Sequence, residues 1–157
     1  MRKLSSRLNA VLSLIVGNTL VDIGTDHAYL PIEACLKGRV ETAIACDLNP
    51  GPLKTATENV KRYGLTHRVE LRLGYGLSPI CCGEADCITI AGMGGMRIID
   101  ILHESPSVVH SVKRMVLQPQ HDIPAVRMYL YSIGFRIVDE ISLREKGHLY
   151  TVMAAEA

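Results

Sequence analysis

Near the N-terminus the chain reads Val21-Asp-Ile-Gly-Thr-Asp-His-Ala-Tyr29, an apolar run that leads into a glycine and carries two acidic residues. The residues from Thr19 to Gly24 predict a short strand, and Gly24 lets the backbone approach a ligand closely. A helix that begins just after this turn can point its free amide groups at the same ligand. The stretch therefore predicts one strand of an α/β sheet and one wall of a binding site.

Strands and helices alternate along the rest of the chain at intervals of about 25 residues, the pattern of stacked βαβ units. A short turn at Lys146-Gly147 joins the last two strands, so one of them is expected to run antiparallel. The sequence thus predicts a Rossmann-like α/β fold with a mostly parallel seven-stranded sheet, one antiparallel strand and helices on both faces. The expected strands are Thr19–Gly24, Ala43–Asp47, Arg68–Leu73, Asp86–Ala91, Arg114–Gln118, Phe135–Leu143 and Leu149–Ala154, and the expected helices are Leu4–Val16, Leu30–Leu36, Leu53–Tyr63, Met96–Leu102 and Ala125–Gly134.

The composition fits a single domain that spans residues 1–157. Hydrophobic residues make up 48% of the chain, with six Tyr, one Phe and no Trp, so aliphatic side chains must build the core. The apolar stretch Ala10–Val16 is far shorter than the roughly twenty residues needed to span a bilayer, and it has no signal-peptide cleavage site. A net charge of +1 indicates no particular partner. We expect a soluble, cytoplasmic protein.

The chain has five cysteines and no C-x-x-C pair. Most of them lie in or beside apolar runs, as is typical of buried, reduced thiols in a cytosolic protein. The alternative is a zinc site built from Cys81, Cys82 and Cys87, but two adjacent cysteines are awkward ligands for one ion. We therefore expect no metal.

The turn after the first strand lacks the glycine spacing of a dinucleotide site. A nicotinamide enzyme normally shows G-x-G-x-x-G, whereas Asp26 and Ala28 stand where further glycines are expected. A carboxylate here repels a pyrophosphate but attracts a cationic ligand that has no phosphates. The sequence therefore argues against a nicotinamide dehydrogenase and for S-adenosylmethionine, which carries sulfonium and ammonium groups.

Asp47 ends the second expected strand and can accept hydrogen bonds from both hydroxyls of a ribose. The alternative interpretation is a surface aspartate that caps the turn beside Pro50. Gly74-Tyr-Gly76 follows the third strand and forms a loop on which an adenine ring can lie.

Three glycines in four residues follow the fourth strand, in Gly92-Met-Gly-Gly95. Such a run costs chain entropy and is typical of a backbone that must contact a ligand, although a tight strand-to-helix turn is the simpler alternative. On the functional interpretation, the carbonyl groups of Ala91 and Gly92 face the methyl group and its acceptor. The expected catalytic residues are Asp26, Gly92 and Met93.

Several motifs, in this order along the chain, resemble one family. They are Leu4-Ser-Ser-Arg-Leu8, Asp22-Ile-Gly-Thr-Asp-His-Ala-Tyr-Leu-Pro31, Asn49-Pro-Gly-Pro52, Ile90-Ala-Gly-Met-Gly-Gly95, Leu117-Gln-Pro119, and Glu145 with Tyr150. Over essentially the whole chain they resemble the TrmK-type bacterial tRNA (adenine-N1)-methyltransferases, which modify the adenosine at position 22 of certain tRNAs. The second and fourth motifs together are highly specific.

The resemblance implies methyl transfer from S-adenosylmethionine to N1 of adenine 22 in tRNA. Contacts to tRNA are expected from Arg2, Lys3, Arg7 and Arg97, with a second basic cluster at Lys61, Arg62 and Arg68, although such charges are commonly just solvated. His27 either contacts substrate or cofactor, or is a neutral histidine bonded to the start of a helix. The residues expected to bind the cofactor are Asp22, Gly24, Thr25, Asp26, His27, Ala28, Asp47, Leu48, Asn49, Gly74, Tyr75, Gly76, Ala91 and Gly92.

Two positions depart from the family pattern. The loop after the third strand usually reads Gly-Asp-Gly, and its Asp accepts a hydrogen bond from the adenine amino group. Tyr75 stands there instead; it can stack on the ring but offers no carboxylate. Gln120 replaces an Asn after the Gln-Pro motif. Family members usually continue into a C-terminal helical, coiled-coil-like extension that helps to grip tRNA, whereas the sequence ends at Ala157.

Two other functions remain as alternatives. The modest net charge and the absent extension favour a methyltransferase for a small molecule or a protein. Tyr75 favours a non-catalytic module that binds nucleotide or RNA, and failure to bind S-adenosylmethionine would support that alternative. The sequence does not indicate an oligomeric state.

Overall fold

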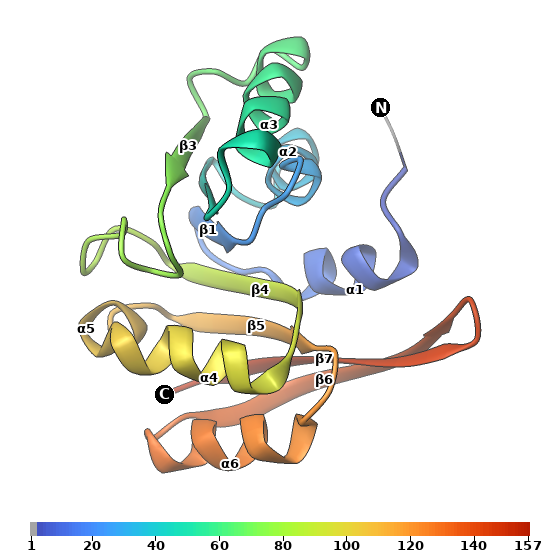
Figure 1. The fold of residues 1–157 in the computed structure, drawn as a ribbon, viewed down its shortest axis with the longest axis vertical. Coiled ribbons are helices and arrows are strands. Elements are labelled where there is room, and N and C mark those ends of the chain that lie inside the picture. The colour runs from blue at the N-terminus through green and yellow to red at the C-terminus, as the bar shows by residue number, and fades with distance from the viewer. Residues whose placement is uncertain (1–2) are drawn as a thin grey trace.

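The computed structural model describes residues 3–157 and contains a seven-stranded sheet in the order β3-β2-β1-β4-β5-β7-β6 (Figure 1). The strand β7 is antiparallel to both of its neighbours, and the pairs from β3 to β5 are all parallel. The predicted mostly parallel sheet with one antiparallel strand is therefore confirmed. The strands are β1 (Thr19–Ile23), β2 (Thr42–Asp47), β3 (Val69–Leu73), β4 (Cys87–Met93), β5 (Arg114–Pro119), β6 (Arg136–Glu145) and β7 (His148–Glu156).

Helices cover both faces of the sheet, as predicted. Helices α1, α2 and α3 pack on one face, and α4, α5 and α6 pack on the other (Figure 1). Successive strand residues face opposite sides, so Leu20 belongs to the apolar core under the first three helices and Val21 to the core under the other three. The helices are α1 (Ser6–Leu14), α2 (Tyr29–Leu36), α3 (Pro50–Arg62), α4 (Gly95–Glu104), α5 (Pro106–Val109) and α6 (Ile123–Ser132).

Most element boundaries differ from the predicted ones by one or two residues, and α3 differs most. It begins at Pro50 rather than Leu53, because a proline is well tolerated in the first turn, where its missing N–H needs no partner. The sequence does not predict α5, which has four residues and is too short to show a helical repeat. The cap of α1 is Ser5, one of the two expected serines, and its hydroxyl accepts the N–H of Leu8.

The strand order reverses at β1, which lies between β2 and β4. The carboxyl ends of these strands are level, since Ile23 pairs with Cys46 of β2 and with Ile90 of β4. A bulge interrupts the pairing of β4 with β5 between Ala91 and Met93. Ligands of open α/β sheets bind at such a reversal, beyond the carboxyl ends of the strands.

The hairpin formed by β6 and β7 extends past the body of the molecule, on the side where α1 begins (Figure 1). Its turn is Lys146-Gly147, as predicted, and both residues have a positive φ. Within residues 3–157, every helix is too short or too polar to cross a bilayer.

Candidate functional site

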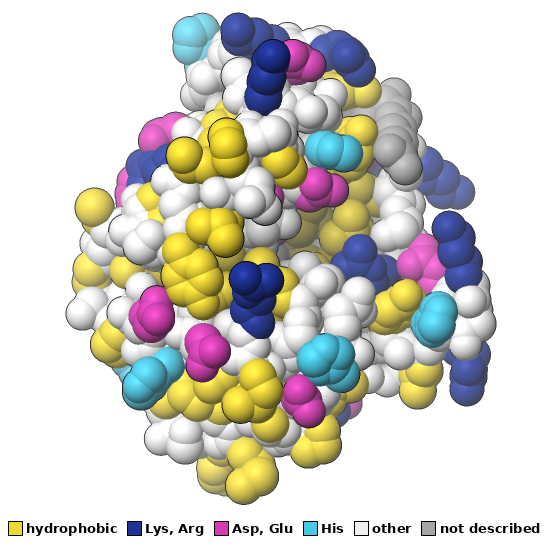
Figure 2. Space-filling view, viewed as in Figure 1, with side chains coloured by type: hydrophobic (Ala, Val, Ile, Leu, Met, Phe, Trp, Pro, Cys, Tyr) yellow, Lys and Arg dark blue, Asp and Glu magenta, His cyan; other side chains and the backbone are white. Residues whose placement is uncertain are grey.

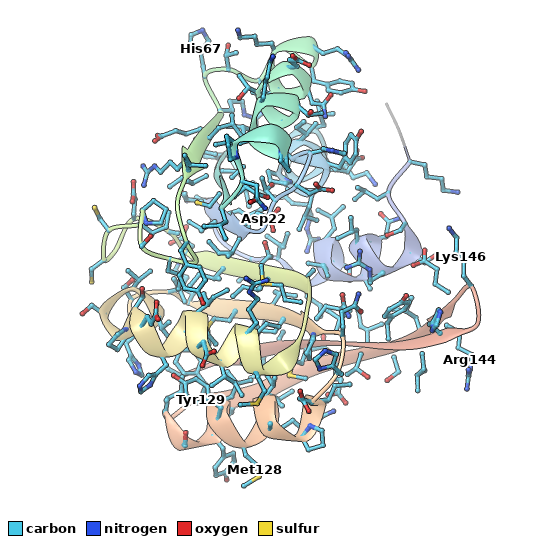
Figure 3. All side chains as sticks on the ribbon, in the orientation of Figure 1. Asp22, His67, Met128, Tyr129, Arg144 and Lys146 are labelled. Carbon is cyan, nitrogen blue, oxygen red and sulfur yellow. The ribbon has the colours of Figure 1, made fainter. Side chains whose placement is uncertain are left out.

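Two cavities open at the carboxyl ends of β1, β2 and β4, and Gly24 lines both of them. We call them the Asp47 cavity and the Asp22 cavity, after the buried carboxylate in each. Their volumes are about 230 and 260 Å³. The Asp22 side chain lies near the middle of the molecule, above the end of the sheet (Figure 3). The strand ends that the sequence singled out therefore meet at one place.

The Asp47 carboxylate is buried and held in position by two backbone amides. Its Oδ2 accepts the N–H of Asp26 at 3.0 Å, and its Oδ1 accepts the N–H of Asn49 at 3.0 Å. A carboxylate has about four lone-pair positions, so each oxygen can still accept one more hydrogen bond. The geometry fits a pair of neighbouring hydroxyls. The carboxylate also caps the turn before Pro50, as in the alternative interpretation, but it is buried rather than on the surface.

The rest of the Asp47 cavity is largely apolar. Its wall includes Leu48, Tyr75, Met93 and Ile101, with Arg97 among the residues that line it. The thiol of Cys46 also lines this cavity, and burial raises its pKa to about 12, so it stays protonated and is not a nucleophile. Flat apolar walls beside a hydroxyl-binding carboxylate suit a nucleoside.

The loop from Gly24 to Ala28 has an unusual backbone, with positive φ at Gly24, Asp26 and Ala28. For residues other than glycine this conformation costs roughly 1–2 kcal/mol, so other contacts must hold it. The amide of Thr25 donates to Cys46 O at 2.9 Å, and Asn59 Nδ2 donates to His27 O at 3.0 Å. At Gly24 a Cβ atom would lie 2.6 Å from Cε at the flexible end of Met93, which can move, so the need for glycine here comes mainly from the positive φ.

The Asp22 carboxylate lies at the base of the second cavity. Thr89 Oγ1 donates to Asp22 Oδ1 at 2.7 Å, and burial raises the pKa of Asp22 to about 6. Thr25 lines the same cavity, and its buried hydroxyl lies beside Asp22, whose pKa it lowers. A buried carboxylate at the base of a cavity suits a polar, positively charged ligand, because buried charges are normally paired.

One wall of the Asp22 cavity depends on Gln118, which is fully buried at the end of β5. Its Oε1 accepts the N–H of Gly92 at 2.9 Å and Nη1 of Arg7 at 2.8 Å. The Arg7 guanidinium also lies 6.0 Å from the centre of the Tyr150 ring. The amide of Gln118 therefore fixes the bulged loop of β4 and ties it to α1 and β7.

The side chains of Asp26 and His27 lie at the rim of the Asp22 cavity. The Asp26 side chain is 69% exposed, and His27 Nε2 lies 3.7 Å from its Oδ1. The His27 ring packs edge-on against Tyr29 at 5.6 Å between centroids. Both residues line the Asp22 cavity, where they can contact an incoming substrate.

The structure brings nearly all of the predicted site residues together. In the Asp47 cavity lie Gly24, Asp47, Leu48, Asn49, Gly74, Tyr75, Gly76, Met93 and Arg97. In the Asp22 cavity lie Arg7, Asp22, Gly24, Thr25, Asp26, His27, Ala91 and Gly92. Ala28 lines neither cavity, because it is fully buried at the start of α2.

The predicted basic residues separate into different surroundings. Arg7 points into the Asp22 cavity, and Lys3 lies on a neighbouring groove. Arg2 lies outside the described residues. In the second basic cluster, Arg68 donates to backbone carbonyls of Cys35, Val40 and Glu41, so its role here is structural.

The cysteines do not converge on one place. Cys81 and Cys82 are exposed, whereas Cys87 is buried at the start of β4. Among residues 3–157 no group of three or more side chains is arranged to hold a metal ion.

Sequence reasoning assigned no site role to Gln118 and Thr89, which hold site groups in place, or to the cavity-lining residues Leu8, Ile23, Tyr29, Leu30, Cys46 and Ile101. Gln118 stands in the Leu117-Gln-Pro119 motif, where a polar residue ends an apolar strand just before a proline. This pattern could have predicted a site role for Gln118. Thr89 sits within an apolar strand and could not be distinguished from a buried threonine of the core.

Comparisons with known proteins all find similarity to methyltransferases. Residues 4–153 match the methyltransferase-domain family. The chain is 42% identical over 156 residues to the tRNA (adenine(22)-N(1))-methyltransferase of Bacillus subtilis strain 168, covering 99% of this chain and 66% of that protein. It therefore spans about two thirds of the length of this curated relative.

Solved structures agree with the sequence comparison. The crystal structure of the B. subtilis M1A22 tRNA methyltransferase TrmK matches with a TM-score of 0.94 and 41% identity, over 99% of this chain and 67% of that one. A Streptococcus pneumoniae protein solved in complex with S-adenosyl-L-methionine matches with a TM-score of 0.95 and 39% identity, over 99% of this chain and 73% of that one.

Proposed function

Because the chain belongs to the TrmK-type family of tRNA (adenine(22)-N1)-methyltransferases, we propose that it transfers a methyl group from S-adenosylmethionine to N1 of adenine 22 in tRNA. The observation that carries this proposal is the pair of neighbouring cavities that share Gly24. One has a carboxylate suited to a ribose, and the other has a buried carboxylate suited to an ammonium-bearing chain. We further propose that the protein acts in the bacterial cytoplasm, where tRNA is found.

The residues of both cavities fit S-adenosylmethionine. Asp47 would accept from the ribose hydroxyls, Tyr75 and Leu48 would flank the adenine, and Asp22 would bind the amino acid end. Two carboxylates in neighbouring cavities favour a cationic cofactor over one that carries a pyrophosphate. When bound, the cofactor supplies a methyl group on a positively charged sulfur.

The protein's own contribution is to align the groups and to stabilise charge. N1 of adenine has a lone pair and needs no base to remove a proton, so alignment at the cavity is the main task. The methylated ring is cationic, and the carbonyls of Ala91 and Gly92 and the carboxylate of Asp26 are the groups available to stabilise it. Gln118 accepts the Gly92 N–H at 2.9 Å and so fixes the direction of the Ala91 carbonyl, which belongs to the same peptide group.

Mass spectrometry of tRNA after incubation with the protein and S-adenosylmethionine tests the proposal. We expect 1-methyladenosine at position 22, and its loss from a tRNA that carries guanosine there. In Asp26→Asn we expect transfer to fall about tenfold, because an exposed charge a few ångströms away contributes on the order of 1 kcal/mol. Asparagine tolerates the positive φ of this position, so the backbone should be preserved. Unmethylated tRNA together with methylation of another acceptor would contradict the proposed substrate.

A further inference from the structure

The hairpin of β6 and β7 carries a group of cations that the sequence analysis did not single out. Arg144 and Lys146 stand at its tip, and both are exposed (Figure 3). His148, also exposed, begins β7 on the other side of the turn. Lys and Arg side chains are visible along this edge of the molecule in the space-filling view (Figure 2).

The side chains of these cations form no ion pair within the part of the chain that is described, although Asp26 and Glu145 line the same groove as the two lysines. Neither Arg144 nor Lys146 makes an ion pair or hydrogen bond with residues 3–157, and the same holds for Lys3. Other arginines are engaged: Arg114 pairs with Glu156 at 2.9 Å, and Arg127 pairs with Glu140. The positive charge at the hairpin tip is therefore available to a partner.

A groove joins the hairpin tip to the Asp22 cavity. Lys3 and Lys146 line its outer end, and Asp26, His27 and Tyr29, which also line the Asp22 cavity, form its inner end. The groove has a volume of about 490 Å³. A strand of nucleic acid whose base entered the cavity would leave along this groove.

The tip is held in a fixed position relative to the cavity. Glu145 Oε1 accepts the N–H of Ser6 at 3.0 Å, so the hairpin is attached to the start of α1. The same helix carries Arg7, which lies against Tyr150 of the hairpin and donates to Gln118. The bond to Ser6 also engages one oxygen of the Glu145 carboxylate, which is one of two acidic groups in the groove; the other is Asp26 at its inner end.

We propose that the hairpin tip, with Arg144 and Lys146 and with Lys3 facing it across the groove, binds the phosphate backbone of the RNA next to the target base. This rests on the proposed function, since a base drawn out of its stack places its neighbouring phosphates at the rim of the cavity. Basic side chains that neutralise phosphates release counterions, which makes affinity fall with salt. The hairpin thus positions the RNA while the cavities perform the chemistry.

The test compares two double variants by tRNA binding at several salt concentrations. Arg144→Gln with Lys146→Asn removes the tip charges, and asparagine suits the positive φ of residue 146. Lys113→Gln with Arg136→Gln, two exposed cations beside the starts of β5 and β6, is the matched control. For the tip variant we expect about tenfold weaker binding and a salt slope smaller by about two, with unchanged affinity for S-adenosylmethionine. The control should bind tRNA as the wild type does.

Equal affinity and equal salt slope in the wild type and the tip variant would overturn the proposal, as would a wild-type protein that does not bind tRNA. An equal loss in both double variants would also overturn it, because the effect would then be one of overall charge. Binding that responds as expected, without methylation of the bound tRNA, would instead contradict the proposed function and leave the hairpin assignment standing.

Discussion

At the scale of single residues, the buried carboxyl group of Asp22 lowers the stability of the folded protein at neutral pH. Its carboxyl group has a pKa of about 6 in the folded protein because burial disfavours the charged form. The ordinary pKa of this side chain is 3.8. Between pH 3.8 and about 6, Asp22 is therefore protonated in the folded state and ionised in the unfolded state. The free energy of unfolding falls as the pH rises through this window and stays lower above it.

We predict that Asp22→Asn stabilises the protein by about 1–3 kcal/mol at pH 8, because it removes a buried charge while keeping an acceptor for Thr89. The gain should be smaller at pH 5, where the wild-type carboxyl is largely protonated in the folded state. Urea unfolding at both pH values measures it. The same variant should bind S-adenosylmethionine more weakly. A gain that is equal at the two pH values would show that the charge is not its source.

Some site residues could be predicted from the sequence because their signal is local. Asp47 ends an apolar run, and Gly24 follows another, so both could be placed at strand ends. Arg7 could not be placed in the same way. It looks like one more cation on an amphipathic helix, and only the packing of α1 against the end of β5 brings it to Gln118.

At the scale of elements, the junction between β4 and α4 depends on two adjacent glycines that differ in their surroundings. At Gly95 a Cβ atom would lie 2.6 Å from the backbone oxygen of His121, which cannot move without displacing the start of α6. At Gly94 the nearest atom is Cε1 of His121, at 2.6 Å, and that exposed ring can rotate away.

We predict that Gly95→Ala destabilises the protein by about 1–3 kcal/mol, as expected for overpacking against a rigid neighbour. Gly94→Ala, its matched control, should change stability by no more than about 0.5 kcal/mol. Thermal or urea unfolding of the two variants separates them. If both lost stability equally, the backbone contact at Gly95 would not be the cause.

Element types were predictable and some element ends were not. Alternating apolar runs and turn residues revealed all seven strands, because side chains in a half-buried or fully buried strand follow a simple pattern. The bulge at Gly92 left no such pattern. It arises from pairing with β5 and from the hydrogen bond to Gln118, which are contacts between residues far apart in the chain.

At the scale of the whole molecule, a ligand that fills the two neighbouring cavities should stabilise the entire fold. At a concentration about one hundred times its dissociation constant, such a ligand adds about 2.7 kcal/mol. For a protein of this size that corresponds to a rise in melting temperature of about 5–10 °C. We predict this shift for S-adenosylmethionine and none for NAD, measured by calorimetry.

The variant Asp47→Ala should remain folded by circular dichroism and lose the shift. It leaves the amides of Asp26 and Asn49 without their acceptor, so its own melting temperature should be lower than that of the wild type. A wild-type protein that NAD stabilises as much as S-adenosylmethionine does would argue for a dinucleotide site. An Asp47→Ala variant with the full shift would remove the ribose assignment.

The general architecture follows from the alternation of strands and helices, but the place of β7 does not. A short turn between β6 and β7 indicates only that the two run in opposite directions. In the structure β7, and not β6, pairs with β5. This choice depends on which strand of the hairpin has the apolar side chains that complete the core beside Val116 and Leu117.

The insertion of β7 between β5 and β6 has a consequence for biosynthesis. A ribosome makes the chain from its first helix onward, and β6 has no partner in the sheet until β7 emerges and joins it to β5. Helix α1 likewise lacks its contacts to Tyr150 and Glu145 until the hairpin is complete. A chain that lacks β7 therefore leaves β5 with an unpaired edge, and chains with unpaired strand edges are prone to aggregate.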